Sequence, residues 1–185
     1  MAMANQNKIV KVSIFERVII LLVITIIPLH FVIVRYIKEN FSWERVNYFQ
    51  IVSICYAIIL ITLTILQNVF HKPYLAIVFG CHQLEHRSFS FFYRYLKICS
   101  RCSGILIGMF LTVFLSKLNI NKLLFLLGII PIAIDGFYQY YSKNESTNQR
   151  RLLTGILFGP AFLVIVSYYY FFIAKLSMEI VKFIL

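Results

Sequence analysis

Five apolar stretches dominate the chain, and within them Asp135 is the only charged residue. They cover residues 18–34, 48–70, 103–116, 123–141 and 152–174. A helix needs about 20 consecutive, mostly apolar residues to cross the hydrocarbon core of a bilayer. The pattern therefore predicts an all-α, polytopic helical membrane protein with about five transmembrane helices.

The third stretch is the shortest of the five. It reaches the length of a span only if the helix continues past Lys117 to about Ile120, with the lysine side chain extending to the interface. Another apolar segment, residues 74–80, is too short to cross and is expected at the interface or as a re-entrant piece. We treat the chain as one membrane unit, with a two-span region at 1–72 and a second region at 73–185.

Composition and charge limit the class of protein and the binding partners that fit this chain. Apolar residues make up 61% of the chain and charged residues 14%, against about 25% charged in soluble proteins. This excludes a soluble enzyme, a disordered tail and a disulfide-stapled secreted domain. The net charge of +11 favours anionic membrane lipids over nucleic acid in so apolar a chain. A cytoplasmic N-terminus puts eleven of the 18 Lys and Arg residues on the inner side, so the positive-inside rule predicts this orientation in the cell membrane.

A Cys/His-rich segment lies between the second and third spans, in loop two (residues 71–102). Cys81 is followed by His82, and Cys99 and Cys102 form a Cys-x-x-Cys pair at the start of the third span. Three cysteines and a histidine suit a tetrahedral zinc ion, and a cytoplasmic position keeps thiols reduced. Because adjacent residues seldom reach one ion together, the fourth ligand is left open between His82, His86, Glu85 and water. An open position indicates catalysis, and a closed one a structural role.

Two alternatives compete with the metal site. Cys99 and Cys102 at a helix N-terminus are typical of a redox pair, with Cys81 as a relay. The plainer alternative is that these cysteines are small buried residues. Cys55, in the middle of the second span without a neighbouring ligand, is interpreted as packing.

Asp135 is the acid within a predicted span, and Gln139 follows it one turn later on the same face. A charged side chain at the centre of a membrane helix costs about 2.5–3.5 kcal/mol, so it should face the bundle or a wet cavity. We expect it near loop four (residues 142–151), on the same side as loop two. The alternative is that the Asp135 side chain extends to the interface or is paired only for packing.

Loop four is rich in polar and basic residues. Ser146 with Gln149 fits a capping box for the fifth helix. Arginines beside two helix N-termini favour a site for phosphate or carboxylate, although they also commonly anchor a protein at the lipid surface. The hypothesis assigns catalytic roles to Asp135, Glu145 and Arg151. It assigns substrate binding to Arg101, Gln139, Asn148 and Arg150.

Paired glycines begin the third and fifth spans. Gly104 with Gly108, and Gly155 with Gly159, form small-xxx-small patterns that let two helices approach closely. They predict tight packing of these helices beneath the candidate site.

The ordered combination of motifs resembles a known family. It comprises Cys81-His82-Gln83 with Arg87-Ser88, then Cys99-x-Arg101-Cys102-x-Gly104, Asp135-Gly136, Gln139, Glu145-Ser146-Thr147-Asn148-x-x-Arg151 and Thr154-Gly155. Together these are similar to an uncharacterised prokaryotic membrane protein family catalogued as domain of unknown function 2085. The resemblance covers about residues 81–159 and groups these positions into one site, but it implies no particular reaction.

These features lead to three functional hypotheses. The first is a zinc-dependent hydrolase or transferase acting on a lipid or lipid-phosphate substrate at the cytoplasmic leaflet. The second is a non-enzymatic protein with structural zinc, serving as an ion or solute pathway or as an assembly subunit, which requires a homo-oligomer or a larger complex. The third is a membrane thiol oxidoreductase using Cys99 and Cys102. Expected partners are membrane lipids and an anionic small molecule or lipid phosphate, with no nucleic acid.

Overall fold

All regular elements in the described part of the chain are helices. The computed structural model describes residues 12–38, 48–118, 121–142 and 145–184. The elements are α1 (Ile14–Lys38), α2 (Tyr48–Phe70), α3 (Tyr74–Val78), η1 (Glu85–Arg87), α4 (Ser90–Leu96), α5 (Ser100–Leu115), η2 (Lys122–Gly128), α6 (Ile129–Ser142) and α7 (Asn148–Ile184). The predicted all-α class is confirmed.

Four helical segments are long and apolar enough to span a bilayer, and a bent pair provides a fifth candidate. The four are Ile14–Arg35, Tyr48–Phe70, Lys122–Ser142 and Asn148–Ile180. The pair consists of α4 and α5, whose axes differ by 74°. The chain is therefore a multi-pass helical membrane protein, and its described residues contain four candidate spans, or five if the bent pair forms one.

The third predicted span does not extend past Lys117, as it would need to do to reach full span length. Helix α5 ends at Leu115 and is followed by a turn, so the expected continuation toward Ile120 does not form; residues 119–120 lie outside the described part. Its 16 residues rise about 24 Å, less than the roughly 30 Å of a hydrocarbon core. The segment at 74–80 forms only α3, which is too short to cross, as predicted.

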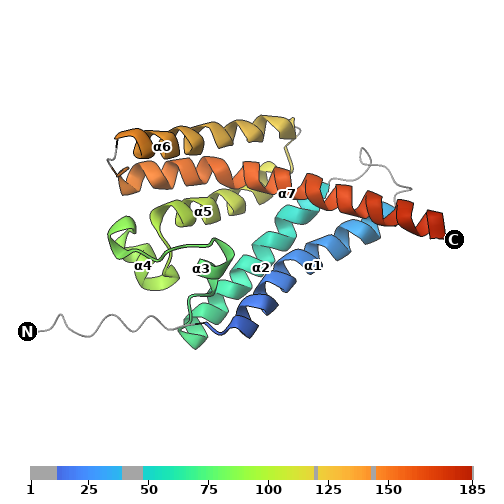
Figure 1. Cartoon of the computed structure of the whole chain (residues 1–185), viewed down its shortest axis with the longest axis horizontal. Coiled ribbons are helices and arrows are strands. Elements are labelled where there is room, and N and C mark those ends of the chain that lie inside the picture. The colour runs from blue at the N-terminus through green and yellow to red at the C-terminus, as the bar shows by residue number, and fades with distance from the viewer. Residues whose placement is uncertain (1–11, 39–47, 119–120, 143–144, 185) are drawn as a thin grey trace, which may run out of the picture.

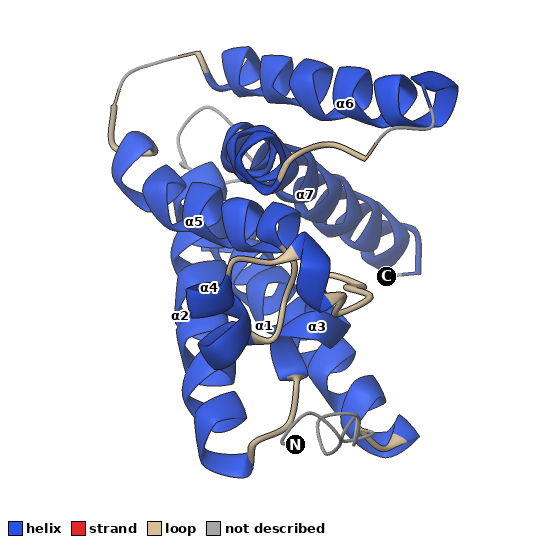
Figure 2. Ribbon diagram, turned by 90° about the vertical axis from the view of Figure 1, so that its left-hand side faces the viewer, coloured by secondary structure: helices blue, strands red, loops and turns tan. Residues whose placement is uncertain are grey.

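The helices form two groups joined by the long helix α7. Figure 1 shows α5 and α6 on opposite sides of the first half of α7, while α1 and α2 run as a pair across its second half. Figure 2, turned by 90°, shows the same order of α6, α7 and α5 from one side to the other. The segment with α3 and α4 lies at the end where α2 finishes and α7 begins (Figure 1).

Helices α5 and α7 cross at close range, where the paired glycines meet. A Cβ on Gly108 would lie 3.1 Å from the Cα of Gly159, and a Cβ on Gly104 would lie 3.1 Å from the Cα of Gly155. Ordinary contacts of a Cβ are 3.4–4 Å, so the backbones approach closely because no side chain separates them. The predicted close packing is confirmed.

Buried polar side chains connect the other helices. The Tyr170 hydroxyl of α7 donates to the Ile24 carbonyl oxygen of α1 at 3.1 Å, and its oxygen lies 3.2 Å from the hydroxyl oxygen of Tyr56 on α2. Gln67 near the end of α2 donates to the carbonyl oxygen of Leu96 at 2.7 Å and accepts from the backbone N–H of Leu75 at 3.1 Å. Gln67 therefore fixes the start of α3 and the end of α4, the two short helices of loop two.

Candidate metal centre and ion-pair network

Three cysteine sulfurs converge where loop two meets α5. The Sγ atoms of Cys81, Cys99 and Cys102 all lie within 4.8 Å of one another. Gly80, at φ +57°, turns the chain after α3 and leads into Cys81, while Lys97, at φ +48°, ends α4. Cys99 is the N-cap residue of α5 and Cys102 lies in its first turn, so their spacing places both sulfurs on one side of the helix.

Hydrogen bonds at this cluster favour a thiolate at Cys99. The backbone N–H groups of Cys99 and Gln83 donate to the Cys81 sulfur at 3.2 and 3.5 Å, and the Cys99 and Cys102 sulfurs are 3.4 Å apart. The pKa of Cys99 is lowered, chiefly by hydrogen bonds from the thiols of Cys102 and Cys81, with backbone N–H groups at the start of α5 adding to the effect. The pKa of Cys102 is raised instead, by its hydrogen bonds with the sulfurs of Cys81 and Cys99 and by burial. Because the three sulfurs converge, these cysteines could hold a metal ion, which would bind them as thiolates.

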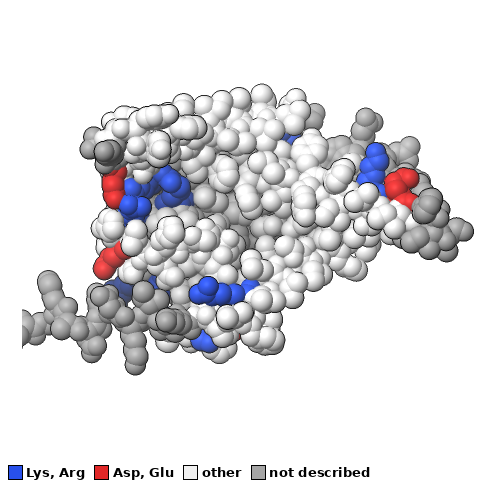
Figure 3. Space-filling view, viewed as in Figure 1, with Lys and Arg blue, Asp and Glu red and all other residues white. Residues whose placement is uncertain are grey.

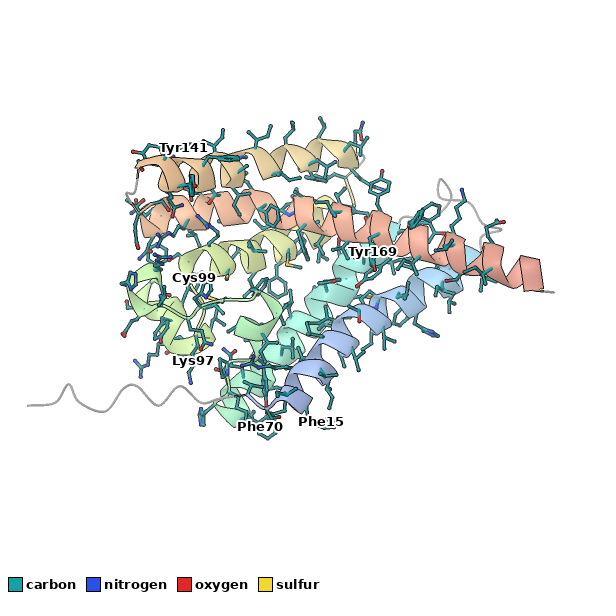
Figure 4. The ribbon with its side chains drawn as sticks, in the orientation of Figure 1. Phe15, Phe70, Lys97, Cys99, Tyr141 and Tyr169 are labelled. Carbon is teal, nitrogen blue, oxygen red and sulfur yellow. The ribbon has the colours of Figure 1, made fainter. Side chains whose placement is uncertain are left out.

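The cluster provides three protein ligands within the described part of the chain. His82, predicted as the fourth, is exposed and does not belong to the group of converging ligand atoms, and neither do His86 and Glu85. The Nε2 atom of His86 instead lies 3.8 Å from a carboxylate oxygen of Glu145. Figure 4 shows Cys99 at the beginning of α5, close to Lys97.

Asp135 on α6 is 1% exposed and is held by groups from three directions. Its Oδ2 atom accepts from Arg101 of α5, from Gln139 at 2.7 Å and from Ser146 at 3.3 Å. Arg150 of α7 places its Nε atom 3.3 Å from Oδ1, but in an orientation that makes no hydrogen bond, so Oδ1 is a buried acceptor without one. The acid thus faces the helix bundle, as predicted.

Glu145 forms a second group of ion pairs, which joins loop two to the start of α7. It accepts from Arg87 and, at 3.3 Å, from Arg151. These two guanidinium groups lower the pKa of the Glu145 carboxyl, with the hydrogen bond from Arg87 as the main cause. Asn148 strengthens the same junction, because its side-chain amide donates to the carbonyl oxygens of His86 and Ser88, each at 3.3 Å.

The two carboxylate groups belong to one network. Arg151, only 4% exposed, donates from Nε to the Ser146 hydroxyl at 3.1 Å, and that hydroxyl donates to Asp135. The predicted convergence of loops two and four on one end of the molecule is therefore present. The predicted helix cap is shifted, because Thr147, rather than Ser146, accepts from the backbone N–H of Arg150 at 3.3 Å. Ser146 is instead occupied by Asp135 and Arg151.

The network contains more positive than negative groups. Figure 3 shows basic and acidic side chains gathered at the end of the molecule where α5, α6 and α7 come together. Four arginines, at positions 87, 101, 150 and 151, pair with the carboxylates of Asp135 and Glu145. The Nε atoms of Arg87 and Arg101 are buried without a hydrogen-bond acceptor. The surplus of guanidinium groups suits an anion.

Sequence reasoning missed several members of the network. Arg87 and Ser88 occur in the family motif, but no site role was assigned to them. The ring of Tyr138 lies under the Arg150 guanidinium, with 4.9 Å between the guanidinium carbon and the ring centroid. Cavities of about 650, 400 and 350 Å³ in the described part are lined by mostly apolar side chains, and none of these three is lined by Asp135, Glu145 or Arg151.

The network lies within the part of the chain that matches a known protein family. A family model described as a predicted membrane protein, DUF2085, matches residues 81–179. An uncharacterized protein of Methanocaldococcus jannaschii is 37% identical over 87 residues, which are 43% of this chain and 56% of that protein. An uncharacterized protein of Methanothermobacter thermautotrophicus is 41% identical over 92 residues, 46% of this chain and 82% of the other. The chain thus spans about half the length of the first relative. No solved structure matches.

Proposed function

The chain belongs to the DUF2085 family of predicted membrane proteins, and from this premise we propose that it is a zinc-dependent hydrolase or transferase acting on a lipid-phosphate substrate. The site opens to the cytoplasmic leaflet in this proposal. Its partners are membrane lipids and the anionic substrate, and nucleic acid is not among them.

The observation that carries the proposal is the number of converging ligands. The sulfurs of Cys81, Cys99 and Cys102 lie together, and no fourth protein ligand joins them in the described part of the chain. Structural zinc sites are normally closed by four protein ligands, whereas catalytic sites have three and an open position. Cys81, Cys99 and Cys102 would hold the zinc ion, which would supply Lewis-acid chemistry to a phosphoryl oxygen or to water.

The arginine surplus supports an anionic substrate. Arg101 and Arg150 are 30% and 44% exposed at the side chain, so both can also reach a phosphate group. Arg151 is buried and held by Glu145 and Ser146, which suits a fixed contact to the same anion. Gln139 and Asn148 then orient Asp135 and the loop-two backbone.

Asp135 is the better candidate for the general base. Its Oδ1 atom makes no hydrogen bond, whereas both oxygens of Glu145 accept from arginines. In the proposed reaction Asp135 takes the proton of the attacking water or alcohol as the new phosphorus–oxygen bond forms. The bond to the leaving oxygen breaks, and that oxygen is protonated by solvent. Glu145 positions Arg87 and Arg151.

A second candidate is a structural zinc in a non-enzymatic protein. It is favoured by the ion pairs themselves, since Asp135 and Glu145 are both engaged by arginines and Asn148 fastens loop two to α7. In that case zinc and the ion pairs hold one end of the bundle together, and the protein serves as an ion or solute pathway or as an assembly subunit.

Metal analysis of protein purified under reducing conditions tests both candidates. We expect about one zinc per chain, lost in Cys99→Ser and kept in the matched control Cys55→Ser, because Cys55 lies on α2 outside the cluster. Absence of zinc, together with a reversible Cys99–Cys102 disulfide, would instead support the thiol oxidoreductase.

X-ray absorption and activity then separate the two zinc roles. Three sulfurs with one oxygen favour catalysis, and a fourth ligand lost in His82→Ala favours structure. In proteoliposomes containing lipid phosphates, Asp135→Asn should retain zinc and lose about 10²–10⁴-fold in phosphate release. Zinc-loaded protein that releases no phosphate, or that is unaffected by Asp135→Asn, would rule out this catalytic assignment.

Orientation has a separate measurement. A membrane-impermeant thiol reagent added to intact cells should leave Cys81 unmodified in a Cys55→Ser background, and should modify it once the cells are opened. Modification of Cys81 in intact cells would place loop two outside the cell.

A further inference from the structure

The short helix α4 exposes an aromatic surface next to the metal loop. Phe91 is 67% exposed and Tyr95 47% exposed, and their ring centroids are 5.1 Å apart. They are four residues apart, so they share one face of the helix. Phe92 extends this surface, with its ring centroid 5.9 Å from that of Phe91. The aromatic surface of α4 is defined here as these three residues.

The orientation of α4 fits the plane of a membrane surface. Its axis is turned by 74° from that of α5. If α5 crosses the bilayer, α4 lies close to parallel with the leaflet. Figure 1 shows α4 at the same end of the molecule as the end of α2 and the start of α7, two of the candidate spans.

The neighbouring structure holds α4 in place. Gln67 donates to the carbonyl oxygens of Tyr95 and Leu96 at 3.2 and 2.7 Å, and the Lys97 ammonium donates to the carbonyl oxygen of His71 at 3.2 Å. These three bonds tie the end of α4 to the end of α2. The position of the aromatic surface relative to α2 is therefore fixed.

Basic side chains accompany the aromatic rings. Arg94 is exposed and lies over the ring of Tyr95, with 5.9 Å between its guanidinium carbon and the ring centroid. Lys97 follows directly after the helix. Aromatic residues are enriched at the headgroup level of membranes, and basic ones beside them attract anionic lipids.

We propose that α4 is an interfacial helix whose aromatic surface is seated in the lipid leaflet on the loop-two side, with Arg94 contacting anionic headgroups. Because Cys99 follows α4 after two residues, this contact brings the three cysteines to the level of the headgroups. The inference does not require zinc or catalysis, so it stands or falls separately from the proposed function.

A tryptophan reporter tests the contact in proteoliposomes. Trp43, the single tryptophan of the chain, is replaced by Phe, and Phe91→Trp is introduced. We expect quenching by lipids brominated near the headgroup end of the acyl chain and protection from aqueous iodide. The control Ile130→Trp, at an exposed position midway along the span of η2 and α6, should be quenched best by lipids brominated near the chain end.

Other outcomes overturn the proposal. If iodide quenches the Phe91→Trp reporter as strongly as in unfolded protein, the helix faces water. If neither iodide nor brominated lipid quenches it, protein covers the surface, as in a homo-oligomer. For headgroup contact, shallow quenching should favour brominated anionic over zwitterionic lipid by roughly fivefold, and Arg94→Gln should remove that preference. If Arg94→Gln kept the same preference for anionic lipid as the wild-type reporter, that result would also contradict the proposal.

Discussion

The crossing of α5 and α7 allows a sharp test of the helix packing, by the substitution Gly108→Ala. The added Cβ would lie 3.1 Å from the Cα of Gly159 and from the carbonyl carbon of Ile156, and closer still to the Ile156 carbonyl oxygen. The first two distances fall 0.3 Å short of the 3.4 Å at which ordinary contacts begin. All three atoms belong to the backbone, so relief requires the two helices to move apart. Such overpacking costs about 1–3 kcal/mol.

The chain offers a matched control in Gly136→Ala on α6. A Cβ at Gly136 meets no atom within 4 Å, and alanine favours a helix over glycine by about 0.8–1.0 kcal/mol. Its apparent Tm in detergent, followed by circular dichroism, should be unchanged or slightly raised. Gly108→Ala should lower the apparent Tm by about 2–4 °C for each kcal/mol. Equal Tm values for Gly108→Ala and the wild type would show that these backbones are not in close contact.

Three further perturbations address the polar contacts. Asp135→Asn should lower stability by about 1–3 kcal/mol, less than for a fully buried ion pair because its partner Arg101 is partly exposed; an unchanged apparent Tm would contradict the pairing. The lowered pKa of Glu145 beside Arg87 means that its stabilising effect is complete above the ordinary carboxyl pKa and declines as pH falls through the lowered value. In the wild type, loop two should therefore be cleaved by protease more slowly at neutral pH than at acidic pH, and Glu145→Gln should abolish this difference. If the difference persists in Glu145→Gln, the ion pair of Glu145 with Arg87 is not its source. Tyr170→Phe removes two buried hydrogen-bond contacts and should cost about 0.5–1.5 kcal/mol, measured as apparent Tm, whereas no loss would show that these contacts contribute little.

The fold was predictable where the signal is local. Apolar runs long enough to cross lipid predicted the helical class and the bounds of α2 closely, since the bilayer imposes a length on each span. For α7 they predicted residues 152–174, the middle of a helix that extends from Asn148 to Ile184. The end of α5 at Leu115 was less predictable. The helix begins three residues after Lys97, whose φ is +48°, and it ends at Leu115 although the apolar run continues to residue 116.

The residues of the site were more predictable than the hydrogen bonds and ion pairs that they form. The spacing of Cys99 and Cys102 at a helix start, with Cys81 upstream, predicted a cluster that the structure contains. Residue spacing could not show that Glu145 pairs with Arg87, because 58 positions separate them in the chain. Nor could it show that Ser146 leaves its capping role to Thr147, since Asp135 and Arg151 compete for the same hydroxyl.

Hydrophobicity, charge and short-range spacing acting along the chain are sufficient to establish a multi-pass helical protein with three clustered cysteines and a polar end. Charge and spacing act between residues that are near in the sequence, and hydrophobicity acts through the bilayer, which is the same solvent for every span. The choice of partner for each buried polar group is made between segments far apart in the chain, where a guanidinium and a carboxylate must find one another once lipid and protein exclude water. That choice joined Asp135 to Arg101, fixed α4 through Gln67 and left the cysteine cluster with three converging protein ligands in the described part of the chain.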